Sequence, residues 1–86
     1  MEKLSRSEII ILESLIKNKC NNEVRAFTIR RISLETKLSY FTVRNLLKGL
    51  VYLGVCDKGL SSKNAYTYFV TEKGISEYKK LCKEVF

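Results

Sequence analysis

Residues 38–56 read LSYFTVRNLLKGLVYLGVC, and this stretch decides the fold. Ser39 belongs to the residue types that cap the N-terminus of a helix, and Gly54 suits the left-handed backbone that follows many helix ends. Between these two residues the apolar side chains recur at the spacing of an α-helix. The sequence therefore predicts a helix from Tyr40 to about Leu53. Its apolar face, which we expect in the core, consists of Val43, Leu46, Leu47, Leu50 and Leu53.

The opposite face of this predicted helix carries Phe41, Arg44, Asn45, Lys48 and Tyr52. Arg can form two hydrogen bonds to guanine, Asn can do the same to adenine, and an apolar side chain can contact the methyl group of thymine. A helix is also narrow enough to enter the major groove. This face is therefore a candidate for reading DNA bases, and the competing interpretation is an ordinary solvated helix face.

An earlier helix is predicted from Ser5 to about Lys19. Ser5 and Glu8 have the spacing of a capping box, and Asn21-Asn22 ends the helix. Its apolar residues cover more surface than one packing contact requires. Two interpretations stay open: the helix lies at the centre of the monomer, or its surplus face forms a dimer. The apolar stripe consists of Ile9, Leu12, Leu15, Ile16 and Cys20, is widened by Ile11, and leaves Ile10 outside it.

The segment between the two helices is short and contains two further elements. The alternation in Val24–Phe27 predicts a brief strand, and Thr28 is a good cap for the helix that follows. Ile29–Thr36 has the pattern of a two-turn helix, and Lys37-Leu38 makes a turn into the helix at Tyr40.

Two extended runs, Val55–Leu60 and Ala65–Val70, predict a β-hairpin around the polar stretch Ser61–Asn64. Period-two alternation places Tyr66, Tyr68 and Val70 on one face of the second strand, and Ala65, Thr67 and Phe69 on the other. Thr71 then caps a final helix, predicted over Glu72–Phe86. Its apolar stripe consists of Ile75, Tyr78, Leu81, Cys82, Val85 and Phe86.

The charge of the chain favours a polyanionic partner. The 86 residues contain 16 Lys and Arg against 9 Asp and Glu, so the net charge is +7 and the pI is about 9.5. The length suits a single domain with one core, over residues 1–86. No apolar run approaches the roughly 20 residues that cross a bilayer, and the N-terminus does not resemble a secretory signal. We therefore expect no membrane partner and a cytoplasmic location.

Most classes of enzyme are disfavoured by the composition. The chain has no His, and its four Gly are scattered, so neither a His-activated nucleophile nor a phosphate-cradling loop is expected. Cys20, Cys56 and Cys82 lie far apart and form no C-x-x-C pair. We expect no catalysis, no cofactor and no metal, and we interpret each Cys as a small buried apolar residue.

The order helix, strand, helix, turn, helix, hairpin, helix resembles the winged helix-turn-helix DNA-binding domains of bacterial and archaeal regulators and their viral relatives. The resemblance spans nearly the whole chain. It is carried by Ile32 to Ser39, by Leu38 to Cys56 and by YFVTEKG at residues 68–74. It implies an α+β fold with the hairpin as the wing, and, for a viral protein, the cytoplasm of the host. One departure is Lys37, which stands where the family often has Gly in the turn.

The resemblance also implies a set of DNA-binding positions and a mode of assembly. The family commonly dimerises through its terminal helices, in agreement with the apolar stripes on both, and an intersubunit disulfide through Cys20 or Cys82 is conceivable. A two-fold dimer would place its recognition helices roughly 34 Å apart and predicts an inverted-repeat site. The implied DNA-binding residues are Tyr40, Phe41, Thr42, Arg44, Asn45 and Lys48 on the recognition helix and Lys58, Ser61, Ser62, Lys63 and Asn64 in the wing.

The sequence thus predicts a sequence-specific regulator of transcription that binds double-stranded DNA. Two alternatives stay open. In the first alternative, the domain is an architectural protein that coats duplex DNA without reading it, which steep salt dependence and similar affinity for all sequences would mark. In the second alternative, the domain is a protein-interaction module of a transcription or replication assembly, with Tyr40, Phe41 and Tyr52 as apolar anchors.

Overall fold

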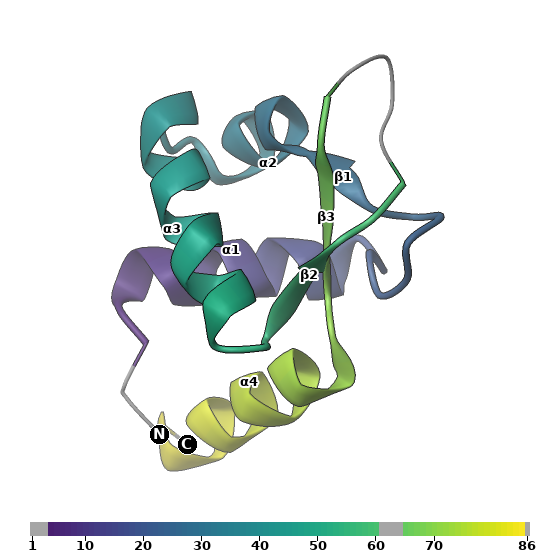
Figure 1. Cartoon of the computed structure of the whole chain (residues 1–86). Helices are drawn as coiled ribbons and strands as arrows, with labels where there is room; N and C mark the ends of the chain where they lie inside the picture. Colours follow the sequence, from purple (N-terminus) through teal and green to yellow (C-terminus); the bar gives the residue numbers. More distant parts are fainter. Residues whose placement is uncertain (1–3, 61–64, 86) are drawn as a thin grey trace.

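The computed structural model describes residues 4–60 and 65–85, with side chains as far as Leu81. Four helices and three strands follow in the predicted order, so the α+β fold class is confirmed (Figure 1). The elements are α1 (Arg6–Lys17), β1 (Phe27–Thr28), α2 (Ile29–Thr36), α3 (Tyr40–Tyr52), β2 (Cys56–Lys58), β3 (Thr67–Val70) and α4 (Glu72–Val85). The predicted hairpin tip, Ser61–Asn64, and the last residue, Phe86, lie outside the described residues.

Helix α1 begins as predicted and ends two residues early. The Ser5 hydroxyl accepts a hydrogen bond from the Glu8 amide at 3.3 Å, and the Glu8 carboxylate accepts one from the Ser5 amide at 2.8 Å, which confirms the capping box. At the other end, the Asn18 side-chain amide donates to the Ser14 carbonyl at 2.8 Å, and Lys19 has a left-handed φ of 59°. Asn18 therefore ends the helix before the predicted Lys19.

The strand predicted over Val24–Phe27 is wrong in position, because β1 is only Phe27–Thr28. The Asn22 side-chain carbonyl accepts hydrogen bonds from the amides of Val24 and Arg25, both at 2.9 Å. Their amides are thus satisfied locally in a turn and are not offered to a neighbouring strand. Thr28 caps α2 as predicted, since its hydroxyl accepts from the Arg31 amide at 3.1 Å.

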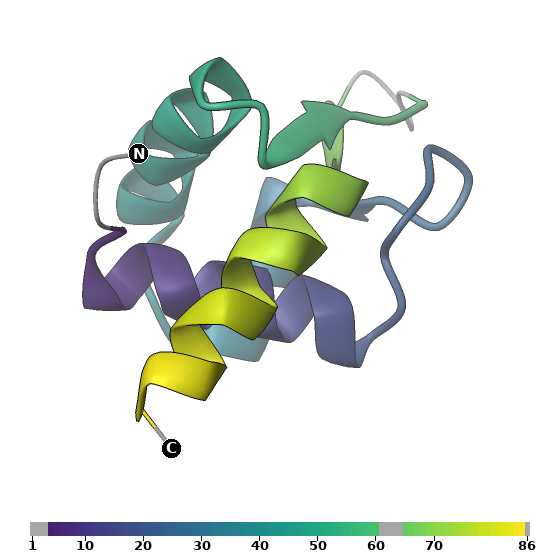
Figure 2. The same cartoon turned by 90° about the horizontal axis from the view of Figure 1, so that it is seen from below.

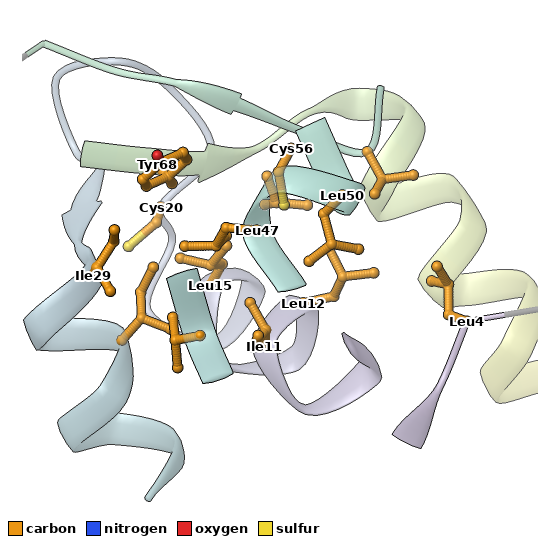
Figure 3. Packing of buried hydrophobic residues seen from close by; sticks show 14 residues of the cluster. Leu4, Ile11, Leu12, Leu15, Cys20, Ile29, Leu47, Leu50, Cys56 and Tyr68 are labelled. Carbon is orange, nitrogen blue, oxygen red and sulfur yellow. The ribbon is translucent and has the colours of Figure 1, made fainter. Parts of the chain in front are cut away.

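The core is built around α1, which packs against α2, α3, α4 and β3. Figure 3 shows Ile11, Leu12 and Leu15 of α1 facing Leu47 and Leu50 of α3, and all five are fully buried. Helix α4 crosses α1 on the outer side of the molecule (Figure 2). The central position of α1 accounts for most of its wide apolar surface, as the first of the two interpretations expected.

The apolar residues predicted on α3 and α4 do pack against the core, but several of them are only half-buried. On α3, Val43 is fully buried with Leu47 and Leu50, whereas Leu46 and Leu53 are half-buried and pack against the edge of the core. The described part of the α4 stripe, Ile75, Tyr78 and Leu81, is likewise half-buried against the core.

The three strands form one antiparallel sheet in the order β1-β3-β2. Tyr68 of β3 pairs with Phe27 of β1 and with Lys58 of β2. The expected alternation fails at Thr67, which is buried next to the buried Tyr68. Its hydroxyl donates to the Leu60 carbonyl, so burial of this polar side chain leaves no hydrogen bond unmade.

Two left-handed residues shape the turns on either side of α3. Lys37, the C-cap of α2, has a φ of 62°, so a Lys adopts the conformation for which the winged-helix pattern often uses Gly. Gly54 follows α3 with a φ of 80°, as predicted for the exit into the hairpin. The Ser33 hydroxyl donates to the Leu38 carbonyl and ties α2 to the turn. Together these contacts fix how α3 is presented beside α2.

Candidate nucleic-acid interface

Helix α3 is held in the core by its apolar side and is capped at its N-terminus by Ser39. The Ser39 hydroxyl accepts from the Thr42 amide at 3.1 Å and donates to the Thr42 hydroxyl at 2.7 Å. The cap therefore occupies the Thr42 hydroxyl, one of the groups expected to face DNA. The 13 residues of α3 span about 20 Å at ~1.5 Å per residue.

The polar side of α3 faces solvent along its whole length. Arg44, Asn45 and Lys48 are exposed, and Phe41 keeps 68% of its surface accessible although it is a large apolar residue. Tyr52, at the C-terminal end, is 90% exposed. An aromatic side chain this exposed gains little from folding, so its position fits a surface that meets a partner.

A hollow of about 590 Å³ lies between α3 and the hairpin. Figure 1 shows the elements that surround it: α3 on one side, the β2–β3 hairpin on the other and α2 beside them. From here on we call it the α3–wing hollow. Its lining residues are Thr28, Ile29, Arg30, Tyr40, Arg44, Lys48, Val51, Lys58, Ala65, Tyr66 and Tyr68.

The lining of the α3–wing hollow is strongly cationic. Arg30 comes from α2, Arg44 and Lys48 from α3, and Lys58 from β2, and no Asp or Glu is among the described residues that line it. The Lys58 ammonium lies 4.8 Å from the centre of the Tyr66 ring, a cation–π contact that holds it over the hairpin. The hollow therefore concentrates positive charge that four residues from three elements supply.

Three tyrosines complete the wall of the hollow. Burial raises the pKa of Tyr68 above its ordinary value of 10.0, and nearby Tyr66 and Tyr40 raise it further, while Arg44 acts in the opposite direction. The Tyr68 hydroxyl is therefore neutral at physiological pH and can donate a hydrogen bond. Tyr40 and Tyr66 are 55% and 62% exposed, so their rings are accessible to a ligand in the hollow.

The structure divides the predicted DNA-binding residues into groups. Tyr40, Arg44, Lys48 and Lys58 come together in the α3–wing hollow. Phe41 and Asn45 are exposed on α3 but are not part of its lining. The predicted wing-tip residues Ser61, Ser62, Lys63 and Asn64 lie outside the described residues.

Sequence reasoning missed seven of the lining residues, and among these Arg30, Tyr66 and Tyr68 bear a charge or a hydroxyl-bearing ring. Arg30 lies on α2, and only the packing of α2 against β1 and α3 makes it part of the wall of the hollow. Tyr66 and Tyr68 were placed on one strand face. Their shared position beside a hairpin lysine was the signal that could have found them.

The cysteines that the structure describes are structural. Cys20 and Cys56 are free, 0% and 1% exposed, and Figure 3 shows both sulfur atoms among core side chains. Burial raises the pKa of Cys20, and it raises the pKa of Cys56 to about 12. A disulfide between subunits through Cys20 is therefore contradicted by its burial, whereas the side chain of Cys82 lies outside the described residues.

Among the side chains that the structure describes, residues 4–60 and 65–81, no group of three Cys, Asp or Glu gathers in a way that could hold a metal ion. Within the same residues, no helix combines the length and the apolar character needed to cross a membrane.

The chain is similar to known DNA-binding proteins over nearly its whole length. The DNA-binding protein TubR from Clostridium botulinum C phage is 30% identical over 78 residues, which are 91% of this chain and 96% of that protein. The solution structure of the DNA-binding TubR fragment from Clostridium botulinum has a TM-score of 0.76 and 29% identity, and the match covers 93% of this chain and 99% of the fragment. TubR from Bacillus megaterium pBM400 has a TM-score of 0.81 and 21% identity over 93% of this chain and 88% of that one.

No family model matches the chain, so its family rests on the relatives. The Bacillus megaterium structure supports the fold alone, because its identity is low. The phage protein supports more, since it is similar over nearly the full length of both chains. The α2–turn–α3 unit and the β2–β3 wing identify the fold as a winged helix-turn-helix, and the chain belongs to the TubR family of DNA-binding proteins.

Proposed function

We propose that this protein is a regulator of transcription that binds double-stranded DNA in a sequence-specific manner, with α3 in the major groove and the β2–β3 wing on the backbone. The observation that carries the proposal is the surface of α3. Arg44, Asn45 and Lys48 are exposed next to the exposed Phe41, and the hairpin adds Lys58 beside them. These side chains combine groups that bond base edges with groups that bond phosphates.

The dimensions of the helix support docking in a groove. The exposed side of α3 is about 20 Å long, and a helix fits the major groove, which is about 12 Å wide. The rigid cap at Ser39 and the buried anchors Val43 and Leu47 hold α3 in one orientation relative to α2. Such a fixed orientation reduces the ordering cost of binding. A DNA ligand also agrees with the cytoplasmic location expected from the sequence, or the host cytoplasm for a viral protein.

We further propose that the protein acts as a two-fold homodimer through α1 and α4. The support is the position of α4 on the outside of α1 (Figure 2) and its apolar stripe, whose described members Ile75, Tyr78 and Leu81 are half-buried in the single chain. A dimer would present two copies of α3 and would favour an inverted-repeat site. Sedimentation equilibrium at micromolar concentration tests the dimer, and a purely monomeric protein would contradict it.

The function is tested by selection from a random pool of duplex DNA at near-physiological salt, followed by sequencing of the bound fraction. We expect one motif to be enriched, and an inverted repeat if the protein is a dimer. Retention of the pool without a motif would indicate an architectural binder. Failure to retain any duplex would contradict DNA binding and would leave the exposed Phe41 and Tyr52 as candidate anchors for a protein partner.

Asn45→Ala tests whether the selected motif is read by α3. Asn45 is exposed on α3, so its replacement leaves the core intact, and its amide is a group that can bond adenine through two hydrogen bonds. We expect this variant to retain duplex DNA and to lose preference for the enriched motif. An unchanged motif would show that base reading does not depend on Asn45.

A further inference from the structure

The exposed side of α3 consists of two rows that face different surroundings. Tyr40, Arg44 and Lys48 are spaced by four residues, lie in one row along the helix and all line the α3–wing hollow. Phe41 and Asn45 form the neighbouring row, are exposed, and do not line the hollow. Two side chains that the sequence alone assigned to the same base-reading face, Arg44 and Asn45, are therefore directed to different places.

Within the part of the chain that the structure describes, the cations in the hollow form no ion pair with an acidic side chain. The ion pairs within the described residues join Arg31 to Glu35 at 3.2 Å and Lys80 to Glu77 at 3.8 Å, and none includes a residue of the hollow. Arg30 and Arg31 are adjacent in sequence but differ in their contacts. Arg31 pairs with Glu35, and its guanidinium also lies 4.9 Å from the centre of the Phe27 ring, whereas Arg30 has no ion pair among the described residues. Four like charges around one hollow repel one another, so an anion that enters it is stabilised by all four.

We propose that the α3–wing hollow holds the sugar-phosphate backbone of one DNA strand, so that Arg44 and Lys48 bind phosphates together with Arg30 and Lys58, and base reading falls to the row of Phe41 and Asn45. This inference rests on the proposed function. The strand that borders the major groove must pass beside a helix that occupies the groove. The space beside α3 on the wing side is this cationic hollow.

The remaining lining residues fit a backbone strand. Tyr40 and Tyr66 offer exposed rings against which a deoxyribose can pack, and the neutral Tyr68 hydroxyl can donate a hydrogen bond to a phosphate oxygen. An enclosed site for a small ligand is less well supported, because no buried side-chain nitrogen or oxygen atom of the described residues lacks a hydrogen-bond partner. Several cations around one hollow fit a polyanion such as the DNA backbone, whose successive phosphates can contact more than one of them at once.

The proposal separates two kinds of variant by their salt dependence. Each phosphate contact contributes about −0.9 to the slope of log K against log salt for duplex DNA. Arg30→Ala and Arg44→Ala should each weaken the binding of the selected duplex and of a scrambled duplex by the same factor, and each should make the slope shallower by about 1. Asn45→Ala should weaken the selected duplex about 5- to 150-fold and leave the scrambled duplex and the slope unchanged.

Arg31→Ala is the matched control, because it removes the same charge from the same helix outside the hollow. We expect it to change affinity and slope much less than Arg30→Ala does. Circular-dichroism melting of each variant separates lost binding from lost folding. If the selection yields no motif, the same slopes are measured on the pooled duplex. There Arg44→Ala must still make the slope shallower, and Asn45→Ala must leave it unchanged.

Three results would overturn the inference. If Arg44→Ala weakens only the selected duplex and keeps the slope, Arg44 reads bases, and DNA binding itself stands. If Arg30→Ala and Arg31→Ala have equal effects, the hollow has no special role. If a deoxynucleoside monophosphate or inorganic phosphate raises the melting temperature of the wild type but not of Arg30→Ala, and the wild type binds no duplex, the hollow serves a free phosphate ester and the proposed function fails with it.

Discussion

At the scale of single residues, two glycines in helices have opposite surroundings. A Cβ atom on Gly49, in the middle of α3, would have no neighbour within 4 Å. A Cβ atom on Gly74, in the first turn of α4, would lie 2.1 Å from the Val55 carbonyl oxygen and 2.7 Å from a Val70 methyl group. The sequence marks both only as helical glycines, and it cannot tell the open position from the crowded one because the neighbours come from distant segments.

These surroundings predict opposite effects of the same substitution. Gly49→Ala should raise the free energy of unfolding by about 0.5–1 kcal/mol, since Ala is the better helix former and nothing obstructs its methyl group. Gly74→Ala should lower it by about 1–3 kcal/mol, because α4 must move away from the Val55 backbone. Urea unfolding measures both. A loss of DNA affinity in Gly49→Ala would show that a partner, and not the protein itself, approaches this glycine closely.

At the scale of the elements, the sequence predicts best where a single segment contains all the determinants. Ser5 with Glu8, Thr28 and Ser39 each cap the helix that follows them, and hydrogen bonds to the amides three residues onward confirm all three. Prediction fails where the backbone has a second choice of partner. Asn22 takes the amides of Val24 and Arg25 and so displaces the predicted strand to Phe27.

At the base of the wing, the hydrogen bonds of Thr67 predict how a single substitution changes the stability of the hairpin. The Thr67 hydroxyl donates to the Leu60 carbonyl, and the Thr67 carbonyl accepts from the Gly59 amide at 2.9 Å, so one residue closes the hairpin twice. Thr67→Val keeps the shape and removes the hydroxyl, which leaves the Leu60 carbonyl without this donor. We expect a loss of about 1–2 kcal/mol in the free energy of unfolding.

Hydrogen exchange locates the effect of Thr67→Val in the wing. The Gly59 amide should exchange faster in the variant than in the wild type, because the hairpin opens locally more often. Ala65→Val is the control. Ala65 is exposed and lies two residues before Thr67, so its replacement should change the free energy of unfolding by less than ~0.5 kcal/mol. Equal protection of Gly59 in wild type and Thr67→Val would contradict the tie between Thr67 and the wing.

At the scale of the whole molecule, the site was harder to predict than the fold. The periodicity of α3 correctly separated core from surface, but it could not show that Arg44 and Asn45 face different surroundings. That division depends on where the wing and α2 stand relative to α3, and Arg30 enters the hollow for the same reason. Helical periodicity defines directions within one element, whereas a hollow between elements requires their packing.

The burial of Cys56 in the core predicts how the free energy of unfolding changes at alkaline pH. Cys56 is 1% exposed, and burial raises its pKa from 9.0 to about 12. Above pH 9 the thiol ionises in the unfolded chain but stays protonated in the folded one, so unfolding is favoured by each further rise in pH until the folded thiol also ionises near 12. The contribution of Cys56 to stability is complete below pH 9 and falls by at most ~1.4 kcal/mol per pH unit above it.

Cys56→Ala removes this titration and leaves the others in place. At pH 8 the variant should be less stable than the wild type by about 1–2 kcal/mol, because a buried sulfur atom is lost. Between pH 9 and 10.5 the wild type should lose stability faster, so that the difference between the two proteins narrows by roughly 1 kcal/mol per pH unit. Urea unfolding at pH 8, 9.5 and 10.5 measures the difference. Parallel pH profiles would mean that the Cys56 thiol ionises equally easily in the folded and unfolded chains, and would contradict the effect expected from its burial.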